Sequence, residues 1–317
     1  MEPADMPIAD LVDMESAADV FEEVRAIISL MFPGQPFTAL KDVFKDIVRL
    51  FQGEYPGYQA CNTRYHDLKH TTDAFLAMAR LIHGATIGGI QFDRRQVKLG
   101  LISALMHDTG YIQMLDDQTG TGGKYTQTHI RRSMEFMERY LTQNGYSRED
   151  LDLCSKCLSC TGLDTRIHEI RFDGPEEALL GKMLGTADLF GQLADRSYLK
   201  KLIFLYHEFR EANVAGYEDE LDLFEKTPDF YDFSLRRIER ELGSVNRYLR
   251  HHFKARWNID QDLYQDAIEK NINYLKQVIE AHRVAYRDRK LLSSVVVAKL
   301  LETYVLGKPE PFRMMSR

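Results

Sequence analysis

The chain has 317 residues, of which 44% are hydrophobic and 28% are charged, with 20 glycines and 9 prolines. This composition is typical of a globular protein and excludes collagen-like, disordered and disulfide-scaffold chains. The 41 basic and 48 acidic residues give a formal net charge of −7, which argues against binding to nucleic acid polymers or anionic membranes. A small anionic substrate is compatible with this charge, because a metal ion can reverse the potential inside a cleft.

The apolar runs, the first five residues and the cysteines indicate the cellular compartment of the protein. No apolar run approaches the ~20 residues that a membrane helix requires. Residues 1–5 are acidic and lack the basic and apolar regions of a signal peptide. Four cysteines in this length do not make a disulfide framework, and a reducing compartment fits them. We therefore expect a cytoplasmic protein, with no expectation for its oligomeric state.

Helix start and stop signals recur in the first part of the chain. Ser16 is expected to cap a helix over residues 17–31, which ends before a Pro-Gly pair. Thr38 is expected to cap a helix over residues 39–52, and Asp93 precedes a third helix over residues 94–108.

The second part of the chain carries similar signals. A start resembling a capping box at Ser147 predicts a helix through Cys160, and Pro175 suits the first turn of a helix that runs to Leu193. The helical period then continues from Tyr198 onward, with breaks expected at three places, which are Gly216, Thr227-Pro228 and Gly243.

Strand signals are nearly absent, since only residues 166–172 could be extended. We find no internal repeat, low-complexity tract or linker. We therefore predict one all-helical domain over residues 1–317. In this prediction, helices over about 1–57 and 201–317 flank a core over about 58–200.

Residues 65–73, Tyr-His-Asp-Leu-Lys-His-Thr-Thr-Asp, contain two histidines four positions apart. If the stretch is helical, His66 and His70 share one face of the helix. Two imidazoles on one face suit either two metal ligands or one ligand beside an acid–base group. Asp67, between them, is expected to orient His66 or to support the ligands from behind.

Two further places put carboxylates into apolar helical stretches. His107 and Asp108 end an apolar run over residues 97–106, and Asp188 interrupts another over residues 183–190. An ionised carboxylate in such surroundings is costly unless it is paired or bound to a cation. One such histidine or aspartate alone is more often structural, but the ordered set of three places predicts a metal site.

With these anchors the sequence resembles the HD-domain metal-dependent phosphohydrolase superfamily, and within it most closely the catalytic domain of the cyclic-nucleotide phosphodiesterases. The likeness covers about residues 58–200 and rests on residues 65–73, on Leu-Met-His-Asp at 105–108 and on Thr-Ala-Asp-Leu at 186–189. The resemblance implies an all-α multi-helix bundle with a metal site in its core. It also implies hydrolysis of a phosphate ester.

The resemblance assigns roles to individual residues. In that family the second histidine of the first motif, the His-Asp pair and the late aspartate ligate one metal ion, which implies His70, His107, Asp108 and Asp188 here. The first histidine is the general acid, which implies His66, and Asp108 would also bridge to a second ion. The implied cofactor is one or two divalent ions (Mg, Mn, Fe or Zn), and the implied partner is a small anionic phosphate ester.

The sequence departs from the phosphodiesterase pattern at three points. Asp67 stands where those enzymes usually have asparagine, and Tyr111 stands where they have a further histidine. Neither Gln265 nor Gln277 lies in the context of their purine-clamping glutamine. The second metal and the cyclic-nucleotide substrate therefore stay open.

His129 is the candidate to replace the missing histidine, because it starts a predicted helix and lies off the apolar stripe of that helix. It would hold a second metal or contact phosphate. The alternative is an exposed first-turn histidine, and the sequence favours neither.

Three cysteines share the C-x2-C-x2-C spacing of some iron–sulfur and zinc sites, namely Cys154, Cys157 and Cys160. On a helix this spacing spreads the sulfurs around the surface, and leucines interleave with them as they do in a core. Cysteine is among the most buried residue types, so we expect structural burial.

The sequence thus favours a metal-dependent phosphohydrolase that acts on a phosphodiester, such as a cyclic nucleotide, by a metal-activated water with His66 as general acid. One alternative is a ligand-sensing or scaffold protein that keeps a bound metal but has little turnover, which Tyr111 favours. Another is an oxidative di-iron enzyme, which needs more histidine ligands than this chain offers. No residue is assigned to substrate binding.

Overall fold

The computed structural model describes residues 7–289, and for His282 and residues 284–289 it describes the backbone alone. In this range the chain forms eleven α-helices and four short 3₁₀ helices and no strand, which confirms the predicted all-α class. The α-helices are α1 (Ala17–Met31), α2 (Thr38–Gln52), α3 (Leu68–Ile87), α4 (Arg94–Met106), α5 (His129–Gln143), α6 (Arg148–Ser159), α7 (Pro175–Leu193), α8 (Tyr198–Glu211), α9 (Glu220–Arg240), α10 (Arg247–Trp257) and α11 (Leu263–Arg289). The 3₁₀ helices are η2 (Ile8–Asp10), η3 (Thr109–Tyr111), η4 (Gly122–Tyr125) and η5 (Ile167–Glu169).

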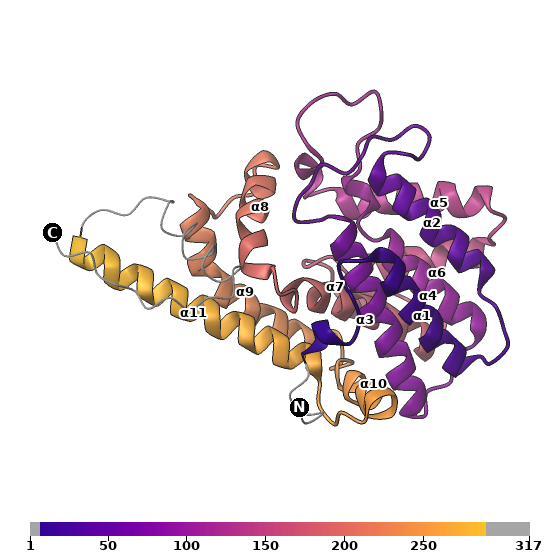
Figure 1. Cartoon of the computed structure of the whole chain (residues 1–317). Helices are drawn as coiled ribbons and strands as arrows, with labels where there is room; N and C mark the ends of the chain where they lie inside the picture. The colour runs from indigo at the N-terminus through magenta and orange to yellow at the C-terminus, as the bar shows by residue number, and fades with distance from the viewer. Residues whose placement is uncertain (1–6, 290–317) are drawn as a thin grey trace.

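Helix α3 is the centre of the fold. Its residues from His70 to Ala85 are all buried, and it packs against α1, α4, α7 and α10. In Figure 1, α1–α6 form one body, and α8, α9 and α11 lie on the other side of α7. The contact with α10 requires a glycine, because a Cβ atom at Gly84 would lie 1.8 Å from the carbonyl oxygen of Tyr248.

Several predicted helix ends are confirmed by their caps. The Ser16 hydroxyl accepts a hydrogen bond from the backbone N–H of Asp19, and capping boxes at Asp93 and Ser147 start α4 and α6. Pro175 occupies the first turn of α7 as expected. These signals are local in sequence, so spacing alone located them.

Three local predictions are wrong. Thr38 is the first residue of α2 and not its cap, since the cap position is Phe37 and has no side-chain hydrogen bond. Helix α9 runs through Pro228 without a break, and buried Phe224 and Tyr231 on either side of the proline keep it in the core. Residues 166–172 contain η5 and no extended strand. The division into flanks and core stays a prediction, and its last part, residues 290–317, lies outside the described residues.

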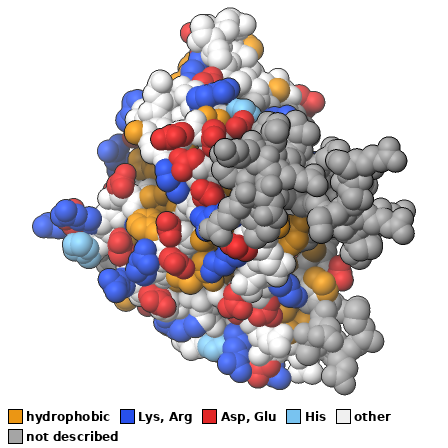
Figure 2. Space-filling model, turned by 90° about the vertical axis from the view of Figure 1, so that its left-hand side faces the viewer, with side chains coloured by type: hydrophobic (Ala, Val, Ile, Leu, Met, Phe, Trp, Pro, Cys, Tyr) orange, Lys and Arg blue, Asp and Glu red, His pale blue; other side chains and the backbone are white. Residues whose placement is uncertain are grey.

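Within residues 7–289, no helix combines the length and apolar character that crossing a membrane requires. On the face drawn in Figure 2, basic and acidic side chains are interspersed, and no wide area of a single sign is visible among the described residues. Interspersed charges of this kind fit the modest net charge of the chain.

Candidate metal centre

Four side chains from three helices converge beneath the surface, and we call them the donor group: His70, His107, Asp108 and Asp188. His70 lies in the first turn of α3, His107 and Asp108 follow the last residue of α4, and Asp188 lies in α7. All four are at most 9% exposed. The three helices pack against one another, so the fold itself brings the donor group together.

The donor atoms lie close to one another. His70 Nε2 is 3.2 Å from His107 Nε2, from Asp108 Oδ2 and from Asp188 Oδ1. His107 Nε2 is 3.4 Å from Asp108 Oδ2 and 3.6 Å from Asp188 Oδ1. For ion–ligand bonds of about 2.0–2.1 Å, adjacent ligand atoms lie about 2.8–3.0 Å apart in an octahedral site and about 3.3–3.4 Å apart in a tetrahedral site. The group His70, His107 and Asp108 therefore has the spacing to hold a metal ion.

The hydrogen bonds around the group also fit a metal. His107 Nδ1 donates to the carbonyl oxygen of Ala104 at 2.8 Å, which leaves the lone pair of Nε2 free to bind. Asp108 Oδ2 is close to His70 but has no hydrogen bond of good geometry. The donor atoms thus lie around a common space, and imidazole with carboxylate suits Mn, Fe or Zn.

Without a cation, the charges of the donor group balance by proton transfer. Burial alone would lower the pKa of His70, but Asp108 and Asp188 raise it to about 9. Burial would raise the pKa of Asp108, but His107 beside it holds this pKa well below its usual range. The metal-free site is therefore an ion pair of imidazolium and carboxylate groups, and an ion must displace protons to bind.

His66 lies beside the donor group but before helix α3, which begins only at Leu68. The prediction that His66 and His70 share a helical face is wrong in that respect, yet their rings are 5.9 Å apart. His66 Nδ1 donates to Glu208 Oε2 at 2.7 Å, and Glu208 Oε1 accepts the backbone N–H groups of Arg64 and Tyr65. A buried carboxylate thus fixes both the ring and the loop that carries it.

Asp67 does not orient His66. Its side chain caps α3 by accepting the backbone N–H of His70 at 2.9 Å and also accepts from Lys201 Nζ at 3.1 Å. An aspartate at the cap position satisfies an otherwise free N–H group, and this local demand decides its role. Sequence spacing missed Glu208 because it lies 142 residues away on α8, in a helix without any motif.

Tyr111 and His129 complete the wall of the site. The Tyr111 ring stacks on His66 with centroids 4.2 Å apart and on His129 with centroids 4.6 Å apart. His129 Nε2 is 3.8 Å from Asp108 Oδ1, which is the carboxylate oxygen turned away from His70. Burial lowers the pKa of His129, and the Asp108 charge offsets only part of that effect. His129 is therefore a site residue and not an exposed first-turn histidine.

The approach of His129 depends on Gly110. A Cβ atom at Gly110 would lie 2.0 Å from the carbonyl oxygen of His129, so only glycine allows α5 to start at this place. Ser133 Oγ accepts the N–H of Gly110, and Arg132 Nε donates to its carbonyl oxygen. These contacts fix the turn after Asp108 against the first turn of α5.

A cleft of about 700 Å³ opens onto this site. The groups of the site that line it are His66, Asp108, Tyr111, His129 and Asp188. Gln192 also lines it, and its Nε2 donates to Asp188 Oδ1 at 2.7 Å while its Oε1 accepts from Tyr65. Neither Gln265 nor Gln277 lines the cleft.

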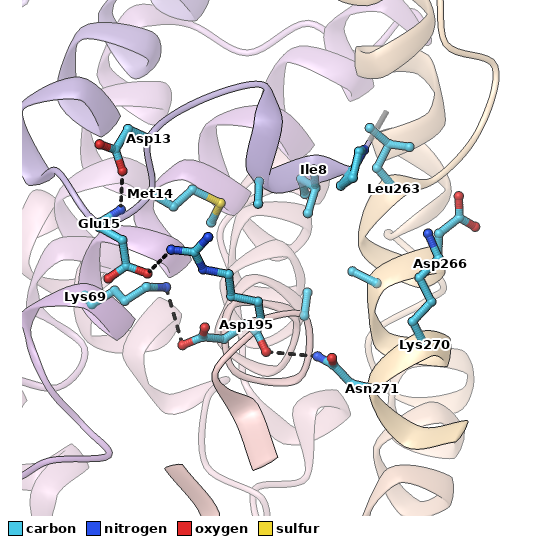
Figure 3. Close-up of a pocket in the computed structure, with 15 residues that line it drawn as sticks. Ile8, Asp13, Met14, Glu15, Lys69, Asp195, Leu263, Asp266, Lys270 and Asn271 are labelled. Atoms are coloured by element: carbon cyan, nitrogen blue, oxygen red, sulfur yellow. Dashed lines mark hydrogen bonds and ion pairs between the residues drawn. The ribbon is translucent and has the colours of Figure 1, made fainter. Parts of the chain in front are cut away.

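A second cavity, of about 330 Å³, lies where η2, the end of α7 and α11 meet, and Figure 3 shows its lining. Next to it lies a set of charged residues that we call the ion-pair cluster: Lys69, Asp73, Asp195 and Lys201. Lys69 Nζ is 2.6 Å from Asp73 Oδ2 and 3.4 Å from Asp195 Oδ2. Lys201 Nζ is 3.4 Å from the same Asp195 oxygen. These side chains neutralise one another and leave no converging donors for an ion.

The cysteine prediction is confirmed. Cys154, Cys157 and Cys160 are buried and free, and burial raises the pKa of the Cys154 thiol to about 12. Such thiols pack as small apolar groups and are poor ligands or nucleophiles.

The chain was compared with known proteins. It matches the sequence model of the family described as Npun_R2479-like over residues 35–271, which is about three quarters of the chain. No curated protein and no solved structure matches it. The likeness to HD-domain enzymes thus rests on the motif residues alone.

Proposed function

The chain belongs to the Npun_R2479-like family, and we propose that it is a metal-dependent phosphohydrolase of HD-domain type that cleaves a phosphodiester. The observation that carries the proposal is the donor group at the end of an open cleft, next to a histidine held by a buried carboxylate. Metal ligands alone would suit a structural ion. A positioned acid at the mouth of the same cleft favours catalysis.

In this proposal, His70, His107, Asp108 and Asp188 hold the ion. A divalent ion bound there lowers the pKa of water and offsets the charge on a phosphoryl group. Gln192 keeps Asp188 in place, since its amide donates to the ligand oxygen.

His66 is the proton donor. Its Nδ1 is taken by Glu208, so Nε2 is the nitrogen available to the cleft. Water attacks phosphorus, the bond to the leaving oxygen breaks, and His66 Nε2 gives its proton to that oxygen. Glu208 stabilises the imidazolium before the transfer and keeps the ring from turning.

His129 is the candidate for a second ion or for the phosphate. Its Nε2 lies 3.8 Å from Asp108 Oδ1, so His129 and Asp108 are the residues that would hold a second ion. A low pKa favours a neutral imidazole, which is the form that binds metal. Tyr111 leaves this second position with fewer ligands than the first.

The test is turnover of a panel after reconstitution with manganese or iron. The panel holds cyclic nucleotides, cyclic dinucleotides, nucleoside monophosphates and bis(4-nitrophenyl) phosphate, with Asp108→Ala measured in parallel. We expect turnover of at least one diester that is lost in Asp108→Ala. A metal-loaded protein that turns over none of them contradicts the proposal.

A ligand-sensing protein with a bound metal is the second candidate. The observation that favours it is the Tyr111 ring, which covers one face of His66 and puts its hydroxyl 3.5 Å from Nε2. Binding of a phosphate ester without turnover, in wild type and in Tyr111→Phe alike, would support this candidate.

A further inference from the structure

The cleft continues from the donor group between α7, α8 and α9, and its outer part is mostly apolar. We propose that the substrate is an ester of one phosphate group with an uncharged apolar body, an aliphatic chain or an apolar ring system, and not a nucleotide. This inference rests on the proposed function and names the substrate class of the same site.

Apolar side chains from four segments line the outer cleft. They come from the turn after α6, from α8, from the α8–α9 loop and from α9, with Leu163, Leu205, Phe209, Val214, Leu223 and Phe230 among them. Leu163 is 42% exposed and lines the cleft, so its side chain offers apolar surface to a ligand there. Leu205, Phe209 and Phe230 are half-buried, so their free surfaces face the cleft that they line.

The cleft offers little cationic charge beyond its histidines. Among its described lining residues, Lys226 is the one lysine or arginine. Its Nζ donates to the Gly216 carbonyl oxygen and to Asp222 Oδ2, both at 2.7 Å. A substrate with a second phosphate would therefore bury charge without a partner, which is costly. The chemistry favours a single phosphate at the donor group.

Five of the polar side chains that line the cleft already form hydrogen bonds within the protein. Gln192 is bonded at both ends, to Asp188 and Tyr65, and Gln127 Nε2 donates to the Ala212 carbonyl oxygen. The hydroxyls of three lining threonines donate to backbone carbonyls of their own turns, namely Thr126, Thr161 and Thr227. Recognition of a nucleobase needs free donors and acceptors aimed at its edge. These five side chains are therefore not free to read the edge of a base.

The test is a series of alkyl 4-nitrophenyl phosphates with methyl, butyl and octyl groups, used on the metal-loaded full chain. All three share one charge and one leaving group, so they differ only in apolar surface. A fully buried methylene group should raise kcat/KM about fourfold, and a half-buried one about twofold. We expect kcat/KM to rise at least about 100-fold from methyl to octyl, and to exceed the value for cyclic AMP.

A matched pair of variants locates the effect. Leu163→Asn removes apolar surface from the rim of the cleft, and Leu115→Asn does the same at a leucine that is 57% exposed and does not line the cleft. Both sites are exposed, so both variants should fold. We expect the octyl-to-methyl ratio to fall at least about threefold in Leu163→Asn, from lost burial of methylenes, and to stay unchanged in Leu115→Asn.

The outcomes separate the two proposals. Equal turnover of all three esters, or faster turnover of cyclic AMP than of the octyl ester, overturns the apolar substrate and leaves the phosphohydrolase standing. If no ester is turned over, the phosphohydrolase fails, and calorimetry with octyl and methyl phosphonate still tests the cleft. Tighter binding of octyl phosphonate then supports an apolar phosphate ligand, and equal binding overturns it.

Discussion

The donor group and the ion-pair cluster are two sets of buried charged residues that each include residues of α3, and they differ in how their carboxylates are compensated. In the ion-pair cluster, Lys69 and Lys201 reach Asp73 and Asp195 directly. In the donor group, the two aspartates pair with histidines and with Gln192. These are the partners of their side chains among residues 7–289. A buried carboxylate needs a cation, and only one of the two sets supplies it from its own lysines.

This difference explains why the two cavities are not equivalent. Figure 3 shows Lys69 turned toward Asp195, so that the charged side chains there bind one another. The atoms of the donor group instead lie around a shared space next to a larger cleft. We infer that the first set holds α3 in place and that the second set uses this support to bind an ion.

The largest effect is expected when one ligand of the donor group is removed. In Asp108→Ala we expect metal binding and turnover to disappear together, because the substitution removes the carboxylate that faces both His70 and His129. Metal content by mass spectrometry and turnover measure the two effects. Asp173→Ala, at an aspartate whose side chain is 78% exposed, is the control and should retain both.

The next largest effect is expected from substitution of His66, the proposed general acid. His66→Ala should keep the ion and reduce kcat by about 10²–10⁴-fold, because proton donation is lost while the ligands remain. Glu208→Gln should cost less, about 10–100-fold, and should also shift the alkaline limb of the pH–rate profile, where the acid loses its proton. A fully active His66→Ala would show that the acid is assigned to the wrong residue.

The ion-pair cluster predicts a loss of stability without a loss of metal. Lys69→Met leaves Asp73 and half of the Asp195 interactions unpaired, and this should lower the free energy of unfolding by about 3–5 kcal/mol at pH 8. Arg131→Met, which breaks an exposed pair with Glu135, should cost at most about 0.5 kcal/mol. Chemical denaturation measures both, and a metal content that falls in Lys69→Met contradicts the separation of roles.

A smaller effect is expected from pH. The stability of the metal-free protein and the affinity for metal should change with pH in opposite directions. The folded-state pKa is raised to about 9 for His70 and, mainly through burial, to about 7 for Asp73. The metal-free protein therefore binds protons more tightly when folded, and its stability should fall as pH rises from about 6.5 to 9. Metal affinity should rise over the same window, because binding requires neutral His70. Thermal unfolding with and without manganese tests both signs.

The sequence was sufficient where function depends on local spacing. Asp108 and Asp188 sit in apolar stretches that make an unpaired carboxylate improbable, so the pattern alone could select them, whereas the choice of His70 as a ligand came from the resemblance. The helix caps at Asp93 and Ser147 are local for the same reason. The meeting of the three motifs in one place could only be inferred from the resemblance.

The sequence was insufficient where distant elements compete with local signals. Asp67 was expected to orient His66 or to support the ligands, but its carboxylate accepts the free backbone N–H of His70 at the start of α3. Glu208 carries that role from α8, and nothing in its surrounding sequence marks it. Pro228 was expected to break a helix, and the tertiary packing of α9 outweighs the lost hydrogen bond.

The most direct measurement of the central claim is a calorimetric titration of manganese into the metal-free chain, in two buffers of different ionisation enthalpy. The account predicts saturable binding with release of protons, because Asp108 and Asp188 raise the pKa of His70 and His107, and a proton held there must leave before an ion binds. Absence of saturable binding, or binding with no proton release, would contradict the assignment of the donor group as a metal centre.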